Sequence, residues 1–335
     1  MFRVEDKRLT LPDGRTLAYA DTGNTSSNIL VLFLHGAFAV GDASKAPAAL
    51  IEHHAHFVAP SLPGWGQSSP VPRATAYAAT LARDMHALIT HLHPDTARLR
   101  LVICGHGIGS ISAQILYGAP QADFPLRAAL ARLVLVSPFS PPHAHREYAR
   151  HLSRGQYMLL GPPARLLPCV PARFAHLSLA PRLRTPPRRE ALVRSYLVDA
   201  ALAGDEHGAF ERWCEKQELR DGQLERDLAA NAALSVAKTW RGFFDLPTVY
   251  HSGWGGYTPD GGDRAKCGVI IVAATTDEWV PCQHAEWLAK NVENASLITL
   301  SGSHLSVLFH MNDVWNEILR DELTLQSETT HDPSI

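Results

Sequence analysis

The stretch that most constrains the fold is Gly-His-Gly-Ile-Gly at residues 105–109, which lies between an apolar run at 99–104 and a helical pattern at 108–117. The apolar run predicts a buried strand, and the glycines predict a sharp turn into a helix. Small residues are needed there because strand and helix nearly touch. A catalytic turn of the form Gly-x-nucleophile-x-Gly has this layout. Its central residue here is Gly107, which has no side chain that could attack a substrate.

The rest of the chain alternates between predicted strands and predicted helices. A Pro-Asp-Gly turn joins the runs at residues 7–11 and 15–20, which predicts a β-hairpin. Further strands are predicted at 28–34, 56–60, 133–136, 267–274 and 296–300, and helices at 46–53, 77–93, 283–291 and 305–323. Strands that alternate with helices imply a parallel sheet with right-handed crossovers. The expected fold class is α/β, with a mostly parallel central sheet flanked by helices.

Between residues 138 and 262 this alternation stops. Ten prolines between residues 138 and 187 break the chain into short pieces. Helices are predicted at 188–203, 209–218 and 224–244, with no strand between them. We therefore expect a helical cap at residues 138–262, inserted into an α/β core of residues 1–137 and 263–325. The polar segment 326–335 is expected to be a disordered tail.

Composition limits the classes of function. A net charge of −2 gives no electrostatic reason to expect a nucleic-acid or membrane partner. No apolar run approaches the ~20 residues of a membrane helix, and no signal peptide is recognised. The five cysteines and the histidine groups at 53–56 and 86–93 lack metal-ligand spacing, so these histidines are expected on the surface. We expect a cytoplasmic protein with free thiols, no metal and no organic cofactor, whose oligomeric state the sequence leaves open.

Five short motifs make the chain resemble the α/β-hydrolase fold superfamily, in the version that carries a helical cap. Each motif is weak alone, and five in the typical order and spacing indicate the fold strongly. The resemblance covers residues 7–323 and departs from the common pattern at Ser61, where many members have Asp, and at Gly107. The motifs are His35-Gly36, Pro63-Gly64-Trp65-Gly66-Gln67-Ser68, Gly105-His106-Gly107-Ile108-Gly109, Asp277-Glu278-Trp279-Val280-Pro281 and Gly302-Ser303-His304.

The resemblance implies roles for residues at the motif positions. His304 would be the general base, because an imidazole exchanges protons near neutral pH. Asp277 would hold the tautomer of His304 and stabilise its charged form, and Glu278 is the alternative partner. The backbone N–H groups of Ala37 and Ile108 would bind an oxyanion.

Gly107 leaves three interpretations open. The first is a serine hydrolase that was inactivated at this residue. The second is a natural glycine serving chemistry without a covalent intermediate, with a water or substrate atom in the vacated space near His304. The third is a pseudoenzyme that only binds. Ser110 is not expected to replace the nucleophile, because it lies inside the following helix and points away from the turn.

The predicted function is that of an esterase-like hydrolase, or of a related acid–base enzyme, acting on a small and largely apolar ester or carbonyl compound. Phe38, His106, Trp254 and Tyr257 are expected to contact this small-molecule substrate. Trp254 and Tyr257 are chosen because caps over such sites usually form the pocket. Two alternatives stay open. One is a lyase or cyclase that uses the His–Asp pair as plain acid and base, and the other is a ligand-binding pseudohydrolase.

Overall fold

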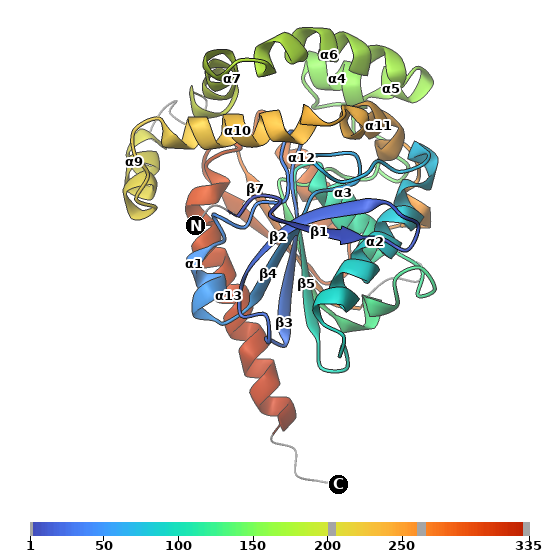
Figure 1. Cartoon of the computed structure of the whole chain (residues 1–335), viewed down its shortest axis with the longest axis vertical. Coiled ribbons are helices and arrows are strands. Elements are labelled where there is room, and N and C mark those ends of the chain that lie inside the picture. The colour runs from blue at the N-terminus through green and yellow to red at the C-terminus, as the bar shows by residue number, and fades with distance from the viewer. Residues whose placement is uncertain (1–2, 200–205, 260–265, 331–335) are drawn as a thin grey trace.

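An eight-stranded sheet lies at the centre of the molecule (Figure 1). The structure, a computed structural model, describes residues 3–199, 206–259 and 266–330. The strand order is β1-β2-β4-β3-β5-β6-β7-β8. Strand β2 is antiparallel to both of its neighbours, and the six strands β3 to β8 are parallel to one another. The predicted α/β class with a mostly parallel sheet is therefore confirmed. The strands are β1 Lys7–Thr10, β2 Thr16–Gly23, β3 Ile29–Leu34, β4 His56–Pro60, β5 Arg100–His106, β6 Leu130–Val136, β7 Gly268–Ala274 and β8 Ala295–Leu300.

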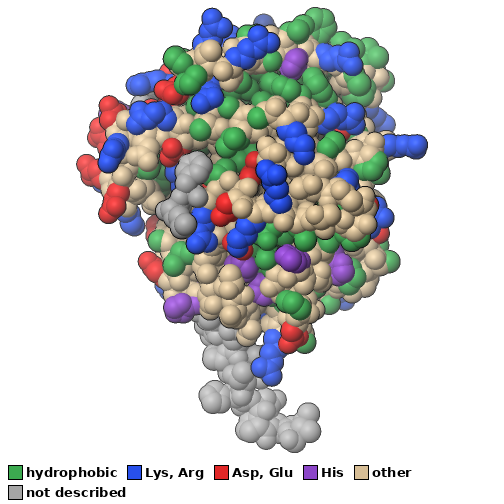
Figure 2. All heavy atoms as spheres, viewed as in Figure 1, with side chains coloured by type: hydrophobic (Ala, Val, Ile, Leu, Met, Phe, Trp, Pro, Cys, Tyr) green, Lys and Arg blue, Asp and Glu red, His purple; other side chains and the backbone are tan. Residues whose placement is uncertain are grey.

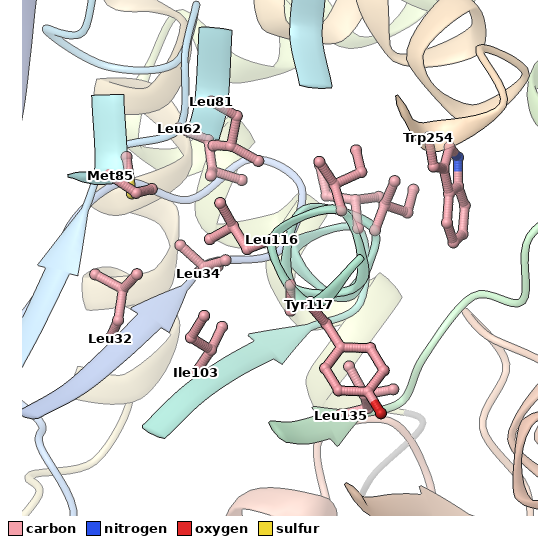
Figure 3. Close-up of a cluster of buried hydrophobic side chains, with 14 of the residues drawn as sticks. Leu32, Leu34, Leu62, Leu81, Met85, Ile103, Leu116, Tyr117, Leu135 and Trp254 are labelled. Carbon is pink, nitrogen blue, oxygen red and sulfur yellow. The ribbon is translucent and has the colours of Figure 1, made fainter. Parts of the chain in front are cut away.

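Helices cover both faces of this sheet, which explains why the central strands are continuous apolar runs. Alternate residues of one strand enter different cores: Leu32 and Leu34 face one side, and Val31 faces the other. Figure 3 shows the first of these cores around Leu32, Leu34 and Ile103. Helices α2 (Tyr77–Leu92), α3 (Gly109–Tyr117) and α12 (Cys282–Asn291) pack on that side, and α1 (Ala48–Glu52) and α13 (Val307–Thr330) pack on the other.

A second layer of helices lies between β6 and β7 in the chain and covers one end of the sheet (Figure 1). In the described part of residues 138–262, no segment adds a strand to the sheet. That this layer is a separable cap domain stays a prediction. Its helices are α4 Arg154–Leu160, α5 Pro162–Leu166, α6 Cys169–Leu183, α7 Pro186–Val193, the π-helical turn Arg194–Val198, α9 His207–Lys216, α10 Gln223–Ala237 and α11 Arg241–Tyr250.

One expectation for the helices is wrong. The single helix expected at 224–244 is two helices, because α10 ends at Ala237 and α11 begins at Arg241. The prolines near residue 162 separate short helices as expected: α4 ends at Leu160, and Pro162 begins α5, since proline at the first helical position has no N–H that needs a partner. The prediction for 188–203 extends to residues 200–203, which lie outside the described residues.

Two histidines also differ from expectation, and the C-terminal tail is described only in part. Helix α13 is described through Thr330 and residues 331–335 lie outside the described residues, so the disordered tail expected at 326–335 stays a prediction. His56 and His93 are buried instead of lying on the surface, and they contact each other, with 2.8 Å between His56 Nδ1 and His93 Nε2. Burial lowers the pKa of both rings. Within the described ranges, no helix is long and apolar enough to span a membrane.

Candidate active site

The turn at residues 105–109 joins β5 to α3 and has the geometry that its sequence predicts. A Cβ atom at Gly105 would lie 2.5 Å from the Gly109 carbonyl oxygen, and one at Gly109 would collide with the Leu34 carbonyl oxygen. Both flanking positions therefore need glycine. Gly107 differs, because it adopts φ +53° and a Cβ there would meet only the Gly36 Cα, at 4.0 Å. The apex of the turn therefore has a left-handed backbone, which glycine adopts without strain, and space for a side chain.

Asp277 and His304 form a hydrogen-bonded pair beside this turn. Both follow the ends of parallel strands, Asp277 after β7 and His304 after β8. Asp277 Oδ2 lies 2.8 Å from His304 Nδ1, and its side chain is only 1% exposed. The other carboxylate oxygen accepts the backbone N–H groups of Trp279 and Val280, at 2.8 Å each. The carboxylate is thus held in one orientation, and Nε2 of His304 is left for a substrate or a water.

The electrostatics of the pair suit a charged carboxylate beside a histidine. Burial raises the pKa of Asp277, but the charge and hydrogen bond of His304 outweigh it, so that the pKa is lowered overall. Glu278 behaves differently, since burial raises the pKa of this carboxyl group. Its Oε2 lies 3.4 Å from the His304 backbone N, not near the ring. The structure therefore pairs the imidazole with Asp277, and Glu278 contacts only the backbone.

The backbone N–H groups of Ala37 and Ile108 are available to an oxyanion. Among the residues that the structure describes, neither group donates a hydrogen bond. Ile108 is the residue at the N-terminal end of α3, where the helix dipole favours negative charge. Ala37 is exposed and lies in the loop after β3. Two unpaired donors beside the apex of the turn could stabilise a carbonyl oxygen that gains charge.

His35 fixes the loop that carries Ala37, a role that the sequence motif alone does not reveal. The ring is buried and bridges two loops, since Nε2 accepts the Leu62 N–H at 2.9 Å and Nδ1 donates to the Gly36 carbonyl at 2.8 Å. Burial lowers the pKa of His35 to about 4. The neutral ring needed for both hydrogen bonds is therefore the stable form at neutral pH.

His106 and Phe38, two of the expected substrate contacts, border the site. The His106 ring lies over the His304 ring with 4.7 Å between centroids. Burial, aided by the charge of His304, lowers the pKa of His106 to about 3, so it adds no positive charge there. Phe38 packs against Trp65 and Phe243, at centroid distances of 5.7 and 5.2 Å. His106 therefore lies against the candidate base, and Phe38 follows Ala37 in the loop and packs on Trp65; contact of either residue with a substrate stays a prediction.

A small cavity of about 20 Å³ adjoins the turn between the core and the helical layer. Ile108, just before α3, and Ile111 line it on one side, and Leu246 and Val249 line it from α11. Trp65, which contacts Phe38, lines it too, together with the polar side chains of Ser112 and Asp245. The surface beside the turn is therefore mostly apolar, and the cavity as it stands has room for about one water molecule.

Trp254 and Tyr257, expected to contact substrate, pack elsewhere. Both are buried, with 1% and 2% exposure, and their rings stack on each other with 6.3 Å between centroids. Tyr257 lies against Gly118 at the end of α3, and the Trp254 N–H donates to the Tyr250 carbonyl. Neither lines the pocket beside the turn. The expectation is wrong for both, because large aromatic side chains of this segment fill the core.

Ser110 cannot replace the missing nucleophile. Its hydroxyl is fully buried, donates to the Gly107 carbonyl at 2.6 Å and accepts the Phe139 N–H at 3.0 Å. The described residues also contain no group of three or more His, Cys, Asp or Glu side chains placed to hold a metal ion. Acid–base chemistry at His304 is what this arrangement can perform.

Glu206, a residue of the helical layer, contacts the loop that carries His304. Its carboxylate accepts a short hydrogen bond from the Ser306 hydroxyl, and Ser306 Oγ in turn accepts the Ser303 N–H at 3.0 Å. Gly302 allows this approach, because a Cβ there would collide with Glu206. Sequence reasoning missed Glu206, since no motif links it to a loop one hundred residues later.

Comparisons with known proteins agree with this fold. The sequence profile of the alpha/beta hydrolase family matches residues 31–318. No curated protein matches the chain. Among solved structures, it is similar to the 2-hydroxy-6-oxo-6-phenylhexa-2,4-dienoate hydrolase of Rhodococcus sp. strain RHA1, with 17% identity, a TM-score of 0.60, and coverage of 96% of this chain and 99% of that one.

Two further structures are similar at the same level. The enol-lactonase of Burkholderia xenovorans LB400 has 18% identity and a TM-score of 0.58, with 95% of this chain and 100% of that chain covered. The esterase of Exiguobacterium antarcticum has 14% identity and a TM-score of 0.52, with 94% and 98% covered. At such identities the likeness shows the fold alone. The match of the family profile over most of the length shows that this chain belongs to the alpha/beta hydrolase family.

Proposed function

We propose that this chain is an esterase-type hydrolase for small, largely apolar esters, in which His304 activates a water molecule instead of a side chain. The observation that carries the proposal is the space above Gly107, where a Cβ would meet nothing closer than 4.0 Å. That space adjoins a histidine held by Asp277 and two backbone N–H groups that have no acceptor among the described residues. The mostly apolar lining of the small cavity beside the turn supports the choice of a small, apolar substrate.

The proposed reaction is a single displacement. Nε2 of His304 takes a proton from the water as the water oxygen bonds to the carbonyl carbon. The electron pair of the C=O bond moves onto the carbonyl oxygen, which the N–H groups of Ala37 and Ile108 stabilise. The tetrahedral species then expels the alcohol oxygen, which takes the proton from His304. An acid and an alcohol result, and no bond to the protein forms.

The experiment measures turnover of short and medium acyl esters by the unmodified chain, His304→Ala and Asp277→Asn. We expect a rate above the ~10³–10⁴-fold over water that oxyanion donors and binding supply without a working triad. His304→Ala should lower the rate to that residual level. An acyl group found covalently on any side chain by mass spectrometry would contradict the proposal, and so would hydrolysis that His304→Ala leaves unchanged.

The same variants test the two alternatives. Cleavage or ring closure of a hydroxylated carbonyl compound that depends on His304, without ester hydrolysis, would identify a lyase or cyclase. Tight ligand binding without turnover of either substrate class would identify a binding protein. Either result would replace the proposed hydrolysis.

A further inference from the structure

The outer surface of the helical layer exposes an unusual number of apolar side chains. Ten large hydrophobic residues are exposed in the described part of the chain, and seven of these lie between residues 157 and 177. Soluble surfaces rarely gather apolar residues in this way unless the patch binds something. We call this surface the cap outer face; its apolar members are Tyr157, Met158, Leu166, Leu167, Val170, Phe174 and Leu177.

Helix α6 carries its exposed apolar side chains on the side that does not pack against the rest of the molecule. Its inner side contacts α11, where the His176 ring lies 4.5 Å from Trp240 and 5.3 Å from Phe244. Val170, Phe174 and Leu177 lie at spacings of four and three residues, which places them together on the outer side. Phe174 is 69% exposed and Leu177 is 68% exposed. The helix is therefore apolar on both sides, although only one side has a partner in this chain.

The same segment is strongly basic. Residues 154–189 contain seven arginines and no acidic residue, in a chain whose net charge is −2. In the part of the chain that the structure describes, none of these arginines forms an ion pair. Figure 2 shows the basic side chains among the hydrophobic ones at the end of the molecule formed by the helical layer. The arginines are Arg154, Arg165, Arg173, Arg182, Arg184, Arg188 and Arg189.

We propose that the cap outer face docks onto the surface of an anionic lipid bilayer. Exposed Phe and Leu side chains gain by entering the boundary between headgroups and acyl chains, and the arginines between them pair with lipid phosphates. Long arginine side chains reach the headgroups while their neighbours insert. The expectation of no membrane partner rested on the net charge of the whole chain. That net charge does not show the local excess of arginines in residues 154–189.

The mixture of residue types favours a bilayer over other partners. A nucleic acid would pair with the arginines and leave Phe174 and Leu177 in water. An acidic protein would need a complementary apolar surface, whereas a bilayer offers both components over a broad area. The helices α4 to α7 are also the outermost layer of the molecule, so a flat partner can approach them without contact to the sheet (Figure 1).

The test is flotation of the full chain with vesicles of phosphatidylcholine alone and with about one-third phosphatidylserine. We expect binding to the anionic vesicles only, weakened when the salt concentration rises from about 0.1 to 0.5 M, because the charge attraction is screened. Phe174→Glu with Leu177→Glu should weaken binding at least about tenfold. Arg173→Glu with Arg182→Glu should do the same, since each arginine contributes about fivefold.

Two control variants place single changes of the same two kinds elsewhere on the surface. Ile51→Glu alters an exposed apolar residue of α1, and Arg98→Glu reverses a charge in the loop before β5. Both should bind vesicles as the unmodified chain does. No flotation of the unmodified chain would overturn the proposal, as would equal losses in the control variants. A dimer that Phe174→Glu dissociates, without any vesicle binding, would assign the face to a second copy and also overturn it.

Discussion

Substituting serine for Gly107 tests whether the site lacks only its nucleophile. The substitution should fold, because the added Cβ would meet only the Gly36 Cα at 4.0 Å. The backbone there has φ +53°, a conformation that disfavours a side chain by about 1–2 kcal/mol. The melting temperature should therefore fall by only a few degrees, about 2–4 °C per kcal/mol for a chain of this size.

The chemical effect should be much larger than the effect on stability. The new hydroxyl would face His304, whose ring is held by Asp277 at 2.8 Å, beside the free N–H groups of Ala37 and Ile108. Removing the nucleophile of a triad typically lowers kcat by about 10⁶-fold. We expect Gly107→Ser to raise ester hydrolysis by at least about 10³-fold, since an added serine recovers only part of that factor.

The assay is release of a chromogenic alcohol under single-turnover and steady-state conditions, with mass spectrometry of the protein. Gly107→Ser should show a burst and an acyl group on the new serine. Gly107→Ala is the matched control, because it has the same backbone strain without a hydroxyl, and it should show neither. If folded Gly107→Ser hydrolyses esters no faster than Gly107→Ala, the geometric reasoning about the turn is refuted.

Three further predictions follow from the same structure. His284 lies in α12 and, like His35, is buried. Burial lowers the pKa of His35 to about 4 and of His284 to about 3, so at pH 5 only the unfolded chain takes up these protons. Each histidine should therefore lower the free energy of unfolding by about 2 kcal/mol at pH 5, and calorimetry should find His284→Gln less sensitive to acid than the unmodified chain. In the Gly107→Ser background, Asp277→Asn should lower kcat about 10³–10⁴-fold, because the amide favours the wrong tautomer of the base, and a kcat that did not change would contradict the assigned pair. In the Gly107→Ser background, Glu206→Ala should lower kcat about tenfold or more with little change in KM, because it removes the hydrogen bond that holds the His304 loop. Glu206→Gln in the same background should recover most of this loss. If both double variants have the same kinetics as Gly107→Ser alone, Glu206 has no positioning role.

The fold was predictable because its signals are local. Each central strand of the sheet is buried on both sides, so it appears in the sequence as a continuous apolar run between turn residues. The motifs that follow these runs lie at the carboxyl ends of parallel strands, and those ends meet at one edge of the sheet. The order of the motifs along the chain was therefore enough to bring Asp277, His304 and the turn at Gly107 together. Their catalytic roles stay predictions.

The remaining features depend on contacts between segments that no local pattern connects. Glu206 reaches Ser306, and His56 meets His93, only because distant elements pack together. Trp254 and Tyr257 have the composition of a substrate pocket, and only the packing of η5 (Trp254–Gly256) against α3 shows that they fill the core. The seven exposed hydrophobic residues of the cap outer face were equally hidden. Sequence alone indicates that a side chain is apolar, but only the tertiary structure decides whether a neighbouring element covers it.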